Sequence, residues 1–401
     1  MPTSPTSSSA VFEPARLGPI TLRNRVIKAA TFEGVTRKRL VTDELIDFHR
    51  KVAAGGVGMT TVAYCAVSRE GSTDGHTLVM SDDAVAGLRD LTDAVHAEGA
   101  AVAAQIGHSG PVATPAGTKS PALAPTRFLA PAGMRPTKAC TDADIARVTE
   151  DFRTATVRAV EAGFDAIEVH LGHNYLLSAF LSPKLNTRTD QWGGSIEARS
   201  RFPRQVLDTV RAAAGDQVAV TAKFNMTDGV PGGLWLDQSV AIARLIEADG
   251  SVDALELTGG SSLANPMYLF RGEAPRADMA ATLPPLVRAG FNVISKRFLK
   301  EYPFEEAFFL PYARQFRASL DLPLILLGGI NRLDTMEAAV DEGFAFVAMA
   351  RALLRDPDLL HKLQSGEAHE SLCIHCNKCM PSTYSGTRCV LVEEPSGAPK
   401  R

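Results

Sequence analysis

The stretch SIEARSRFPRQVLDTVRAAAGDQVAVTAKF, residues 195–224, contains the unit from which most of the chain is built. Its first part, Ser195–Ala214, has apolar residues at helical spacing, and Ser195 with the acid downstream of it is typical of a helix N-cap. Its second part, Val218–Phe224, is a short apolar run. The stretch therefore predicts a helix followed directly by a buried strand.

The same alternation extends in both directions along the chain. A second helical pattern covers Asp142–Ala162, and segments of this kind separate eight short apolar runs. Alternating strands and helices form an all-parallel sheet, and eight repeats favour a closed (β/α)8 TIM barrel in a single domain. The alternative is an open doubly wound sheet, but no G-x-G-x-x-G follows the first strand to support it. The predicted strands are Arg25–Ala30, Val57–Ala63, Ala101–Ile106, Ala166–Val169, Val218–Phe224, Ala254–Leu257, Leu324–Leu327 and Phe346–Met349.

Two long segments interrupt the repeat. Residues 258–323 exceed one crossover and predict an excursion over the barrel mouth, while residues 109–140, rich in Pro, Gly and Ala, predict a second loop or lid. We expect four regions: a disordered tail rich in Ser, Thr and Pro (1–10), the barrel (11–372), a Cys-rich C-terminal segment (373–389) and a C-terminal tail (390–401).

The bulk composition is that of a soluble globular protein. The 401 residues are 45% hydrophobic and 22% charged. A net charge of -3 gives no electrostatic reason to expect a nucleic acid or an anionic membrane as partner. No apolar stretch is long enough to span a bilayer, and the N-terminus lacks the basic and apolar parts of a secretory signal. We therefore expect a cytoplasmic protein, and the sequence leaves its oligomeric state open, a homo-oligomer included.

Two imidazoles and a phenol follow the fourth predicted strand. His170, His173 and Tyr175 come directly after Ala166–Val169, and active sites of TIM barrels lie where the strands end. Such side chains can donate hydrogen bonds to a carbonyl oxygen and supply a proton nearby. The alternative is a helix-capping or core pair of histidines. A metal site is less favoured, because no carboxylate or cysteine lies close in sequence.

Polar side chains also occur in the third and fifth predicted strands. Lys223 has apolar or small neighbours on both sides in VAVTAKF. A buried lysine requires an anion or an electron-rich ligand, unless it lies at a strand edge where its head reaches water. Gln105, at the end of the third strand, offers both a donor and an acceptor.

Small residues follow the last two predicted strands. Gly328 and Gly329 come after the seventh strand, and Ala350 with Arg351 after the eighth. In TIM barrels these two loops commonly bind a phosphate through backbone N–H groups. We therefore predict a phosphate site there.

Four of the six cysteines crowd together near the C-terminus. Cys373, Cys376, Cys379 and Cys389 have the spacing C-x2-C-x2-C-x9-C. Four thiolates so spaced suit a [4Fe-4S] cluster or, less well, a structural zinc. The alternative is a loop with reduced cysteines.

Residues 166–202 closely resemble the Old Yellow Enzyme family of FMN-dependent ene-reductases. The family pattern H-x-x-[HN]-x-Y-L-L, F-L-S-P, N-x-R-x-D, G-G-S and E-x-R-x-R-F is matched throughout, with Trp192 where tyrosine is more common. QIGHSG, which begins at Gln105, matches the family's Q-[LI]-x-H-x-G, although Pro111 replaces the arginine that usually follows.

The resemblance implies an FMN site. It places Lys223, where arginine is more common, beside the flavin N1/O2 edge, and Gln105 at the pyrimidine edge. The first predicted strand continues as NRVIKAATFEG, in which Ala30 and Thr31 fall where backbone contacts to the isoalloxazine are made. Phe32 replaces a threonine or cysteine that hydrogen-bonds the flavin O4, and Ala63 matches a small residue that lets the flavin approach.

The resemblance also implies an activity. NAD(P)H reduces FMN, and an activated alkene then takes its place. His170 and His173 hydrogen-bond the carbonyl oxygen of the substrate, hydride passes from N5 to the β-carbon, and Tyr175 delivers a proton to the α-carbon.

The cysteine cluster narrows the resemblance to the barrel domain of one branch, which contains dienoyl-CoA reductase and trimethylamine dehydrogenase. That branch carries an iron–sulfur cluster at this place, with wider cysteine spacing. The stretch LTGGSSLANPMYLFRG lacks the histidine that assists dienoyl-CoA reduction, so we do not expect that substrate. Three alternatives stay open: a flavin and iron–sulfur dehydrogenase of amines or alcohols, a zinc-dependent barrel hydrolase, and a flavin-binding protein without turnover.

Overall fold

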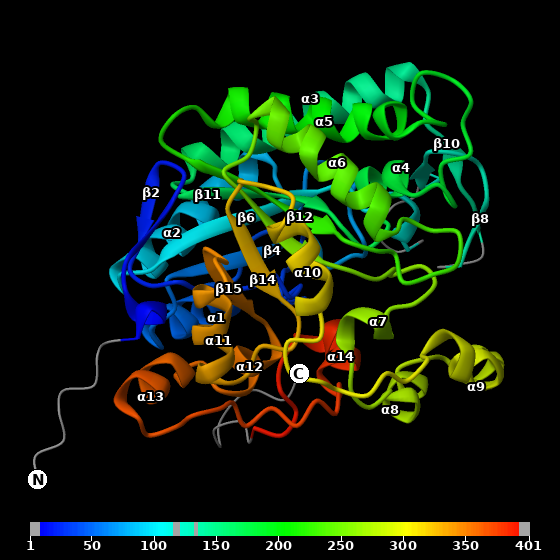
Figure 1. Ribbon diagram of the computed structural model, residues 1–401. Helices are drawn as coiled ribbons and strands as arrows, with labels where there is room; N and C mark the ends of the chain where they lie inside the picture. Colours follow the sequence, from blue (N-terminus) through cyan, green and yellow to red (C-terminus); the bar gives the residue numbers. More distant parts are fainter. Residues whose placement is uncertain (1–8, 115–120, 132–134, 393–401) are drawn as a thin grey trace, which may run out of the picture.

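The computed structural model describes residues 9–114, 121–131 and 135–392, and its centre is a closed barrel of parallel strands (Figure 1). Every strand pairs in parallel with both neighbours, and the barrel closes where the first strand pairs with the last. The predicted (β/α)8 barrel is confirmed, and each predicted strand overlaps an observed one. In chain order the barrel strands are β3 (Val26–Lys28), β4 (Met59–Ala66), β6 (Ala101–Gly107), β11 (Ala166–Leu171), β12 (Ala219–Asn225), β13 (Ala254–Thr258), β14 (Leu324–Leu327) and β15 (Phe346–Met349).

Helices connect consecutive strands and cover the outside of the barrel (Figure 1). Both predicted helices are present, and Ser195 caps the second by accepting the N–H of Ala198. The first begins with a capping box between Thr141 and Asp144. The covering helices are α1 (Asp43–Ala54), α2 (Val85–Ala97), α3 (Asp142–Glu161), α4 (Leu176–Leu181), α5 (Ile196–Ala214), α6 (Leu236–Asp249), α11 (Leu333–Asp341), α12 (Arg351–Arg355) and α13 (Leu359–Ser365).

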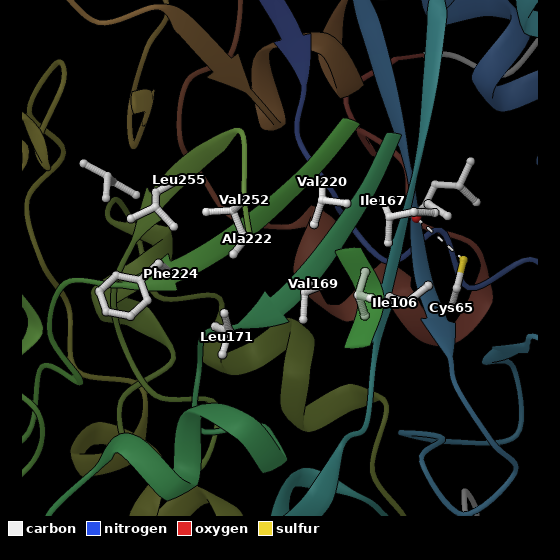
Figure 2. Packing of buried hydrophobic residues seen from close by; sticks show 14 of the residues in the cluster. Cys65, Ile106, Ile167, Val169, Leu171, Val220, Ala222, Phe224, Val252 and Leu255 are labelled. Carbon is white, nitrogen blue, oxygen red and sulfur yellow. Dashed lines mark hydrogen bonds between the residues drawn. The ribbon is translucent and has the colours of Figure 1, made fainter. Parts of the chain in front are cut away.

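The strand alternation separates an outer core from the barrel interior. In β11, the side chains of Ile167, Val169 and Leu171 belong to the large core between strands and helices, where Figure 2 shows them with their counterparts on β12. Burying each such aliphatic side chain stabilises the fold by about 1.5–3 kcal/mol. The alternate residues, Ala166, Glu168 and His170, face the interior. The sequence period therefore brings a histidine to the inner rim.

The N-terminal end of the barrel is filled with small and aliphatic side chains. Alanines from five barrel strands form a cluster with Leu17 and Leu22. These two leucines come from the antiparallel hairpin of β1 (Ala15–Leu17) and β2 (Ile20–Leu22). This end is closed, so the polar C-terminal end holds the candidate site.

The predicted excursion after β13 contains four helices. Its start stays at the barrel mouth, where the ring of Tyr268 lies against Gly229. Helices α8 and α9 project away from the barrel, with α8 next to α14 and α9 farther out (Figure 1). The helices are α7 (Met267–Phe270), α8 (Arg276–Ala281), α9 (Pro285–Phe298), α10 (Leu310–Arg317) and, near the C-terminus, α14 (Cys379–Ser382).

The predicted loop or lid at residues 109–140 carries short pairings only, and its residues 115–120 and 132–134 lie outside the described part. Remaining short elements are β5 (Leu78–Val79), β7 (Leu123–Ala124), β8 (Leu129–Ala130), β9 (Arg135–Pro136), β10 (Lys138–Ala139), and the 3-10 turns η1 (Ala10–Phe12), η2 (Asp82–Ala84), η3 (Gly110–Val112) and η4 (Thr383–Ser385).

The Cys-rich segment returns to the first strand. The N–H of Thr387 donates to the carbonyl of Glu33 at 2.8 Å, and its hydroxyl donates to the carbonyl of Phe32. Of the two predicted tails, residues 1–8 and 393–401 lie outside the described part, whereas Ser9 caps η1 and Ala10 begins it. In the part of the chain described, no helix is long and apolar enough to cross a membrane.

Candidate active site

The three residues expected to be catalytic lie against one another at the C-terminal end of β11. The ring centroid of His170 lies 5.1 Å from that of His173 and 4.5 Å from that of Tyr175. Tyr64, at the end of β4, joins them with its centroid 5.3 Å from that of Tyr175. The hydroxyl of Tyr64 donates to the carbonyl of Gly71 at 3.1 Å. Among the described residues the hydroxyl of Tyr175 has no such partner, so it is the phenol available for chemistry.

Both histidines are neutral in this setting. Burial, the neighbouring His173 and the cation of Lys223 hold the pKa of His170 well below its ordinary value. Burial, followed by Lys223, lowers the pKa of His173 to about 3. Two neutral imidazoles donate hydrogen bonds without bringing a full charge.

Backbone and side-chain contacts orient the pair. His173 and Asn174 both have φ of 60°, which turns the chain sharply after β11. Asn225 Oδ1 accepts the N–H of His173 at 3.1 Å, and Thr258 Oγ1 lies 3.0 Å from its Nε2. His170 Nδ1, by contrast, is buried and has no hydrogen-bond partner among the described residues. A buried polar atom left in this way indicates a missing ligand group.

Tyr175 keeps its proton under ordinary conditions. Burial, together with the charge of Asp74, raises the pKa of its phenol. A neutral phenol beside two neutral imidazoles can give a proton to an anion as that anion forms, which is the requirement of a general acid.

Lys223 finds its anions within the protein. Its Nζ contacts Glu256 Oε1, the residue paired with it in the sheet register, and lies 3.3 Å from Glu168 Oε1. Gln105 Nε2 donates to the same Glu168 oxygen at 2.6 Å. Burial lowers the pKa of Lys223, but the two carboxylates outweigh it and the net shift is upward. The sequence did not predict these two glutamates, and the side chains expected at the flavin edge are part of one buried network.

Burial and the charge of Glu168 raise the pKa of Glu256 to about 8, against the opposing effect of Lys223. Burial and the second carboxylate therefore both favour the protonated form of Glu256.

A second buried ion pair shapes the loop after β3. Lys28 is fully buried, and its Nζ donates to Glu33 Oε1 and Thr31 Oγ1, both at 2.8 Å. Glu33 Oε2 accepts the N–H of Ala63 at 3.0 Å, so one carboxylate joins the ends of the first two barrel strands. Ala30, Phe32, Ala63 and Tyr175 then gather in one small apolar cluster. The structure thus brings together Ala30, Phe32 and Ala63, three of the residues expected to contact the isoalloxazine, and that contact stays a prediction.

The glycines after β14 are needed where they stand. Gly328 and Gly329 have φ of 114° and 78°, and a Cβ on them would come within 2.5 Å of Phe309 and 2.6 Å of Phe308. Their conformation and close packing both require glycine. The rings of Phe308 and Phe309 therefore pack directly against the backbone of the predicted phosphate loop, in which Gly328 is buried and Gly329 half-buried.

The side chain of Arg351 binds two neighbouring segments. Its guanidinium donates to the carbonyls of Phe270 at 2.8 Å and Arg271 at 2.9 Å, and to the side chain of Asn377. These partners belong to the excursion and the Cys-rich segment. The side chain is therefore committed to joining those two segments, and only backbone N–H groups of Ala350 and Arg351 are left for a phosphate.

The four clustered cysteines line one pocket together with Arg351. All four are free thiols. Within the described ranges, no group of three or more His, Cys, Asp or Glu side chains is arranged to hold a single metal ion. The arrangement gives no support to a mononuclear zinc site.

Two of the site residues that the sequence analysis did not predict could be found from the alternation of side chains along the strands. Glu168 and Glu256 each stand between apolar residues in a strand, in phase with alanines that face the interior. Lys28 and Glu33 have the opposite charges but no spacing that predicts a pair. Tyr64 lies in an apolar run that looks like core.

The buried histidines predict that the fold is unstable in acid. Burial lowers the pKa of His49, and lowers that of His108 and His173 to about 3. Because an unfolded histidine titrates near 6.5, the unfolded state binds more protons below that pH, and each such histidine removes about 1.4 kcal/mol of stability per pH unit. Urea unfolding monitored by circular dichroism should show a steep fall in stability between pH 6.5 and 4.

His108 provides the control, because it lies outside the proposed machinery. Replacing it with glutamine should reduce the slope of unfolding free energy against pH by about one proton. A slope equal to that of the wild type would contradict the assignment.

Comparison with known proteins agrees with the geometry. The NADH:flavin oxidoreductase / NADH oxidase family matches residues 10–253. The chain is 62% identical to the 4,4'-dithiodibutanoate disulfide reductase of Rhodococcus erythropolis over 98% of its own length and 96% of that protein. It is 34% identical to a metal reductase of Desulforamulus reducens over 94% of its length, but spans about half (52%) of that larger protein.

Among solved structures, morphinone reductase in complex with tetrahydroNAD superposes with a TM-score of 0.70 and 25% identity, covering 93% of both chains. The family supports FMN as the flavin and NAD(P)H as the reductant. The expected resemblance is confirmed, and the hydrolase alternative is not favoured. The chain therefore belongs to the NADH:flavin oxidoreductase / NADH oxidase family, of the Old Yellow Enzyme type, and is an NAD(P)H-dependent flavin oxidoreductase.

Proposed function

We propose that this enzyme reduces small organic electrophiles, organic disulfides first and α,β-unsaturated carbonyl compounds second. The observation that carries the proposal is the cluster of neutral His170, His173 and Tyr175, with His170 Nδ1 buried and unpartnered. Such a cluster suits an acceptor that becomes an anion when it takes a hydride.

The chain's residues act on that anion. The imidazoles of His170 and His173 donate hydrogen bonds to it, whether it is an enolate oxygen or a thiolate sulfur. Tyr175 supplies the proton, to the α-carbon of an alkene or to the departing thiolate. When bound, FMN supplies the hydride that it receives from NAD(P)H.

The residues present fit FMN. The glycine cradle of Gly328 and Gly329, with the backbone of Ala350 and Arg351, suits a phosphate, and the apolar cluster around Ala63 suits a flat ring. We propose that the isoalloxazine contacts Ala30, Thr31, Phe32 and Ala63, and that Gln105 and Lys223 lie at its pyrimidine edge.

Separate observations favour the two acceptor classes. The relative with 62% identity over nearly its whole length reduces a disulfide by name, and the paired histidines with a tyrosine are what the sequence motif implies for alkenes. Both reactions consume one NAD(P)H and one proton: a disulfide yields two thiols, and an alkene yields its saturated product.

The test uses the purified holoenzyme with NAD(P)H under anaerobic conditions. We expect consumption of NAD(P)H with 4,4'-dithiodibutanoate, two thiols appearing per NAD(P)H, and slower reduction of 2-cyclohexenone. Equal rates without any acceptor, or reoxidation by oxygen only, would overturn the proposal.

We further propose that Cys373, Cys376, Cys379 and Cys389 hold a [4Fe-4S] cluster. The support is that four free thiols line one pocket together with the half-buried Arg351, whose positive charge suits an anionic cluster. Anaerobically purified enzyme should contain about four iron and four sulfide per chain and a broad absorbance that dithionite bleaches. Cys376→Ser should remove both while flavin absorbance remains. Stoichiometric zinc, or no metal, would contradict the proposal.

A further inference from the structure

Arg271 is a cation without an anion. Its Cζ lies 4.9 Å from the ring centroid of Phe308, 5.4 Å from that of Tyr268 and 5.9 Å from that of Tyr302. Its side chain makes no hydrogen bond or ion pair with any residue in the described ranges, and its Nε is buried without a partner. Three aromatic rings thus hold a guanidinium whose donors are unused.

Arg199 and Arg355 also have a buried Nε without a partner among the described residues, but Arg271 differs in that three aromatic rings surround its guanidinium. Arg351, Arg188 and Arg211 all direct their donors to carbonyls or carboxylates. Aromatic faces attract the charge of an arginine, but they do not satisfy its N–H groups. A buried Nε–H without an acceptor is costly, so the arrangement indicates a ligand that supplies the acceptor.

The backbone around Arg271 is fixed from the opposite side. Its carbonyl accepts Arg351 Nη1, and Asn377 Nδ2 donates to the carbonyls of Phe270 and Glu273. The side chain is therefore presented by a rigid support, the condition for recognising a ligand group with defined geometry.

Arg271 is also tied to the candidate active site. It follows α7, and the preceding loop begins at Thr258, which contacts His173, while the N–H of Ser262 donates to the carbonyl of His173. Tyr268 packs against Gly260 of that loop and lines a cavity of about 430 Å³ with Trp235 and Tyr312. One short segment thus carries Ser262, which is hydrogen-bonded to His173, Tyr268, which lines the cavity, and Arg271, which contacts the ring of Tyr268.

We propose that Arg271 is the carboxylate-binding residue of the acceptor site, and that the enzyme prefers electrophiles that carry a carboxylate on a short flexible chain. A carboxylate would take the Nε–H and one Nη–H together, in the two-bond geometry that guanidinium allows and ammonium does not. This inference rests on the proposed function, because it names the feature by which the acceptor is recognised.

The experiment compares binding of a charged and an uncharged acceptor to the oxidised holoenzyme, without NAD(P)H. The probes are 4,4'-dithiodibutanoate and its diamide, titrated by the change in flavin absorbance. We expect the wild type to bind the acid about 10- to 100-fold more tightly than the diamide. Arg271→Gln should remove this preference by weakening only the acid, and Arg271→Lys should restore part of it.

Lys300 provides the matched control. It is exposed, and its Nζ lies 5.1 Å from the centroid of the same Tyr302 ring. Lys300→Gln should leave the preference for the acid unchanged. Thermal unfolding of each variant checks that it is folded, and the lysine variant keeps the test valid if the glutamine variant is unstable.

The following results would contradict the assignment of Arg271 or the proposed function. Equal binding of acid and amide by the wild type, or equal weakening of both by Arg271→Gln, would overturn the inference. If Arg271→Gln instead lowers the affinity for FMN by a similar factor, the anion is the cofactor phosphate, and the inference is also wrong. Selective binding without turnover would sink the proposed function and leave Arg271 assigned. In turnover, the variant should raise KM for the acid and leave kcat nearly unchanged.

Discussion

Replacing Tyr175 with phenylalanine is expected to slow alkene reduction by about 10²- to 10⁴-fold, the usual contribution of a general acid. The phenol is the proton source nearest to His170, and its neutral form is secured by burial. Protonation of a carbon atom needs an acid in position, so water cannot protonate the α-carbon as fast as the phenol does. Stopped-flow reoxidation of the reduced enzyme by 2-cyclohexenone measures this step directly.

The same substitution distinguishes the two acceptor classes. A thiolate has a pKa near 8.5 and leaves readily without a proton. We therefore expect disulfide reduction by the Tyr175→Phe enzyme to fall by less than about tenfold. Flavin reduction by NAD(P)H should not change, and it serves as the control. If alkene reduction survives unchanged, Tyr175 is not the proton donor. The neighbouring Tyr64→Phe should have little effect, because its hydroxyl is already bonded to Gly71.

Replacing Lys223 with methionine is expected to cost about 3–5 kcal/mol of folding stability, the loss typical of a buried ion pair broken on one side. Glu168 and Glu256 would then face each other in the barrel interior without a cation. Urea unfolding at pH 7.5 measures the change.

The pH dependence gives that prediction a second check. The pKa of Glu256 is already raised to about 8, and loss of the cation would raise it further. A group with a raised folded pKa stabilises the fold below its unfolded pKa and loses that effect as pH rises. The deficit of the variant should therefore shrink toward pH 5 and grow toward pH 9.

A double variant provides the control for Lys223→Met. Adding Glu256→Gln removes one of the stranded carboxylates, so the double variant should be more stable than Lys223→Met alone. A double variant that is less stable by the sum of both single effects would show that Lys223 and Glu256 do not interact.

The sequence predicted the barrel because alternation is a local property. Each strand and the helix after it can be recognised in one window, and the eight windows agree. The same holds for His170, His173 and Tyr175, which lie within six residues of one another and reach the site together.

What the sequence missed depends on pairing between distant strands. Lys223 stands opposite Glu256 and beside Glu168 only because of the register of three strands, which no single window contains. The phosphate prediction for the loop of Arg351 concerns backbone N–H groups and stays a prediction, but no local pattern indicated that its side chain would bind a carbonyl 80 residues earlier in the chain. The sequence does not predict a role for Arg271, because an unpaired cation can be recognised only once its neighbours are known.

The contact between Thr387 and Phe32, 355 residues apart, has a consequence for biosynthesis. β3 also pairs with β15, so one edge of the first barrel strand stays unpaired until the last strand has been synthesised. While the chain is still being synthesised, β3 lacks its partner β15, and the loop after β3 lacks its hydrogen bonds to Thr387. The flavin pocket is therefore completed only after nearly all residues have been translated. Ribosome-bound chains that are stalled before β15 has been synthesised should therefore contain no bound flavin.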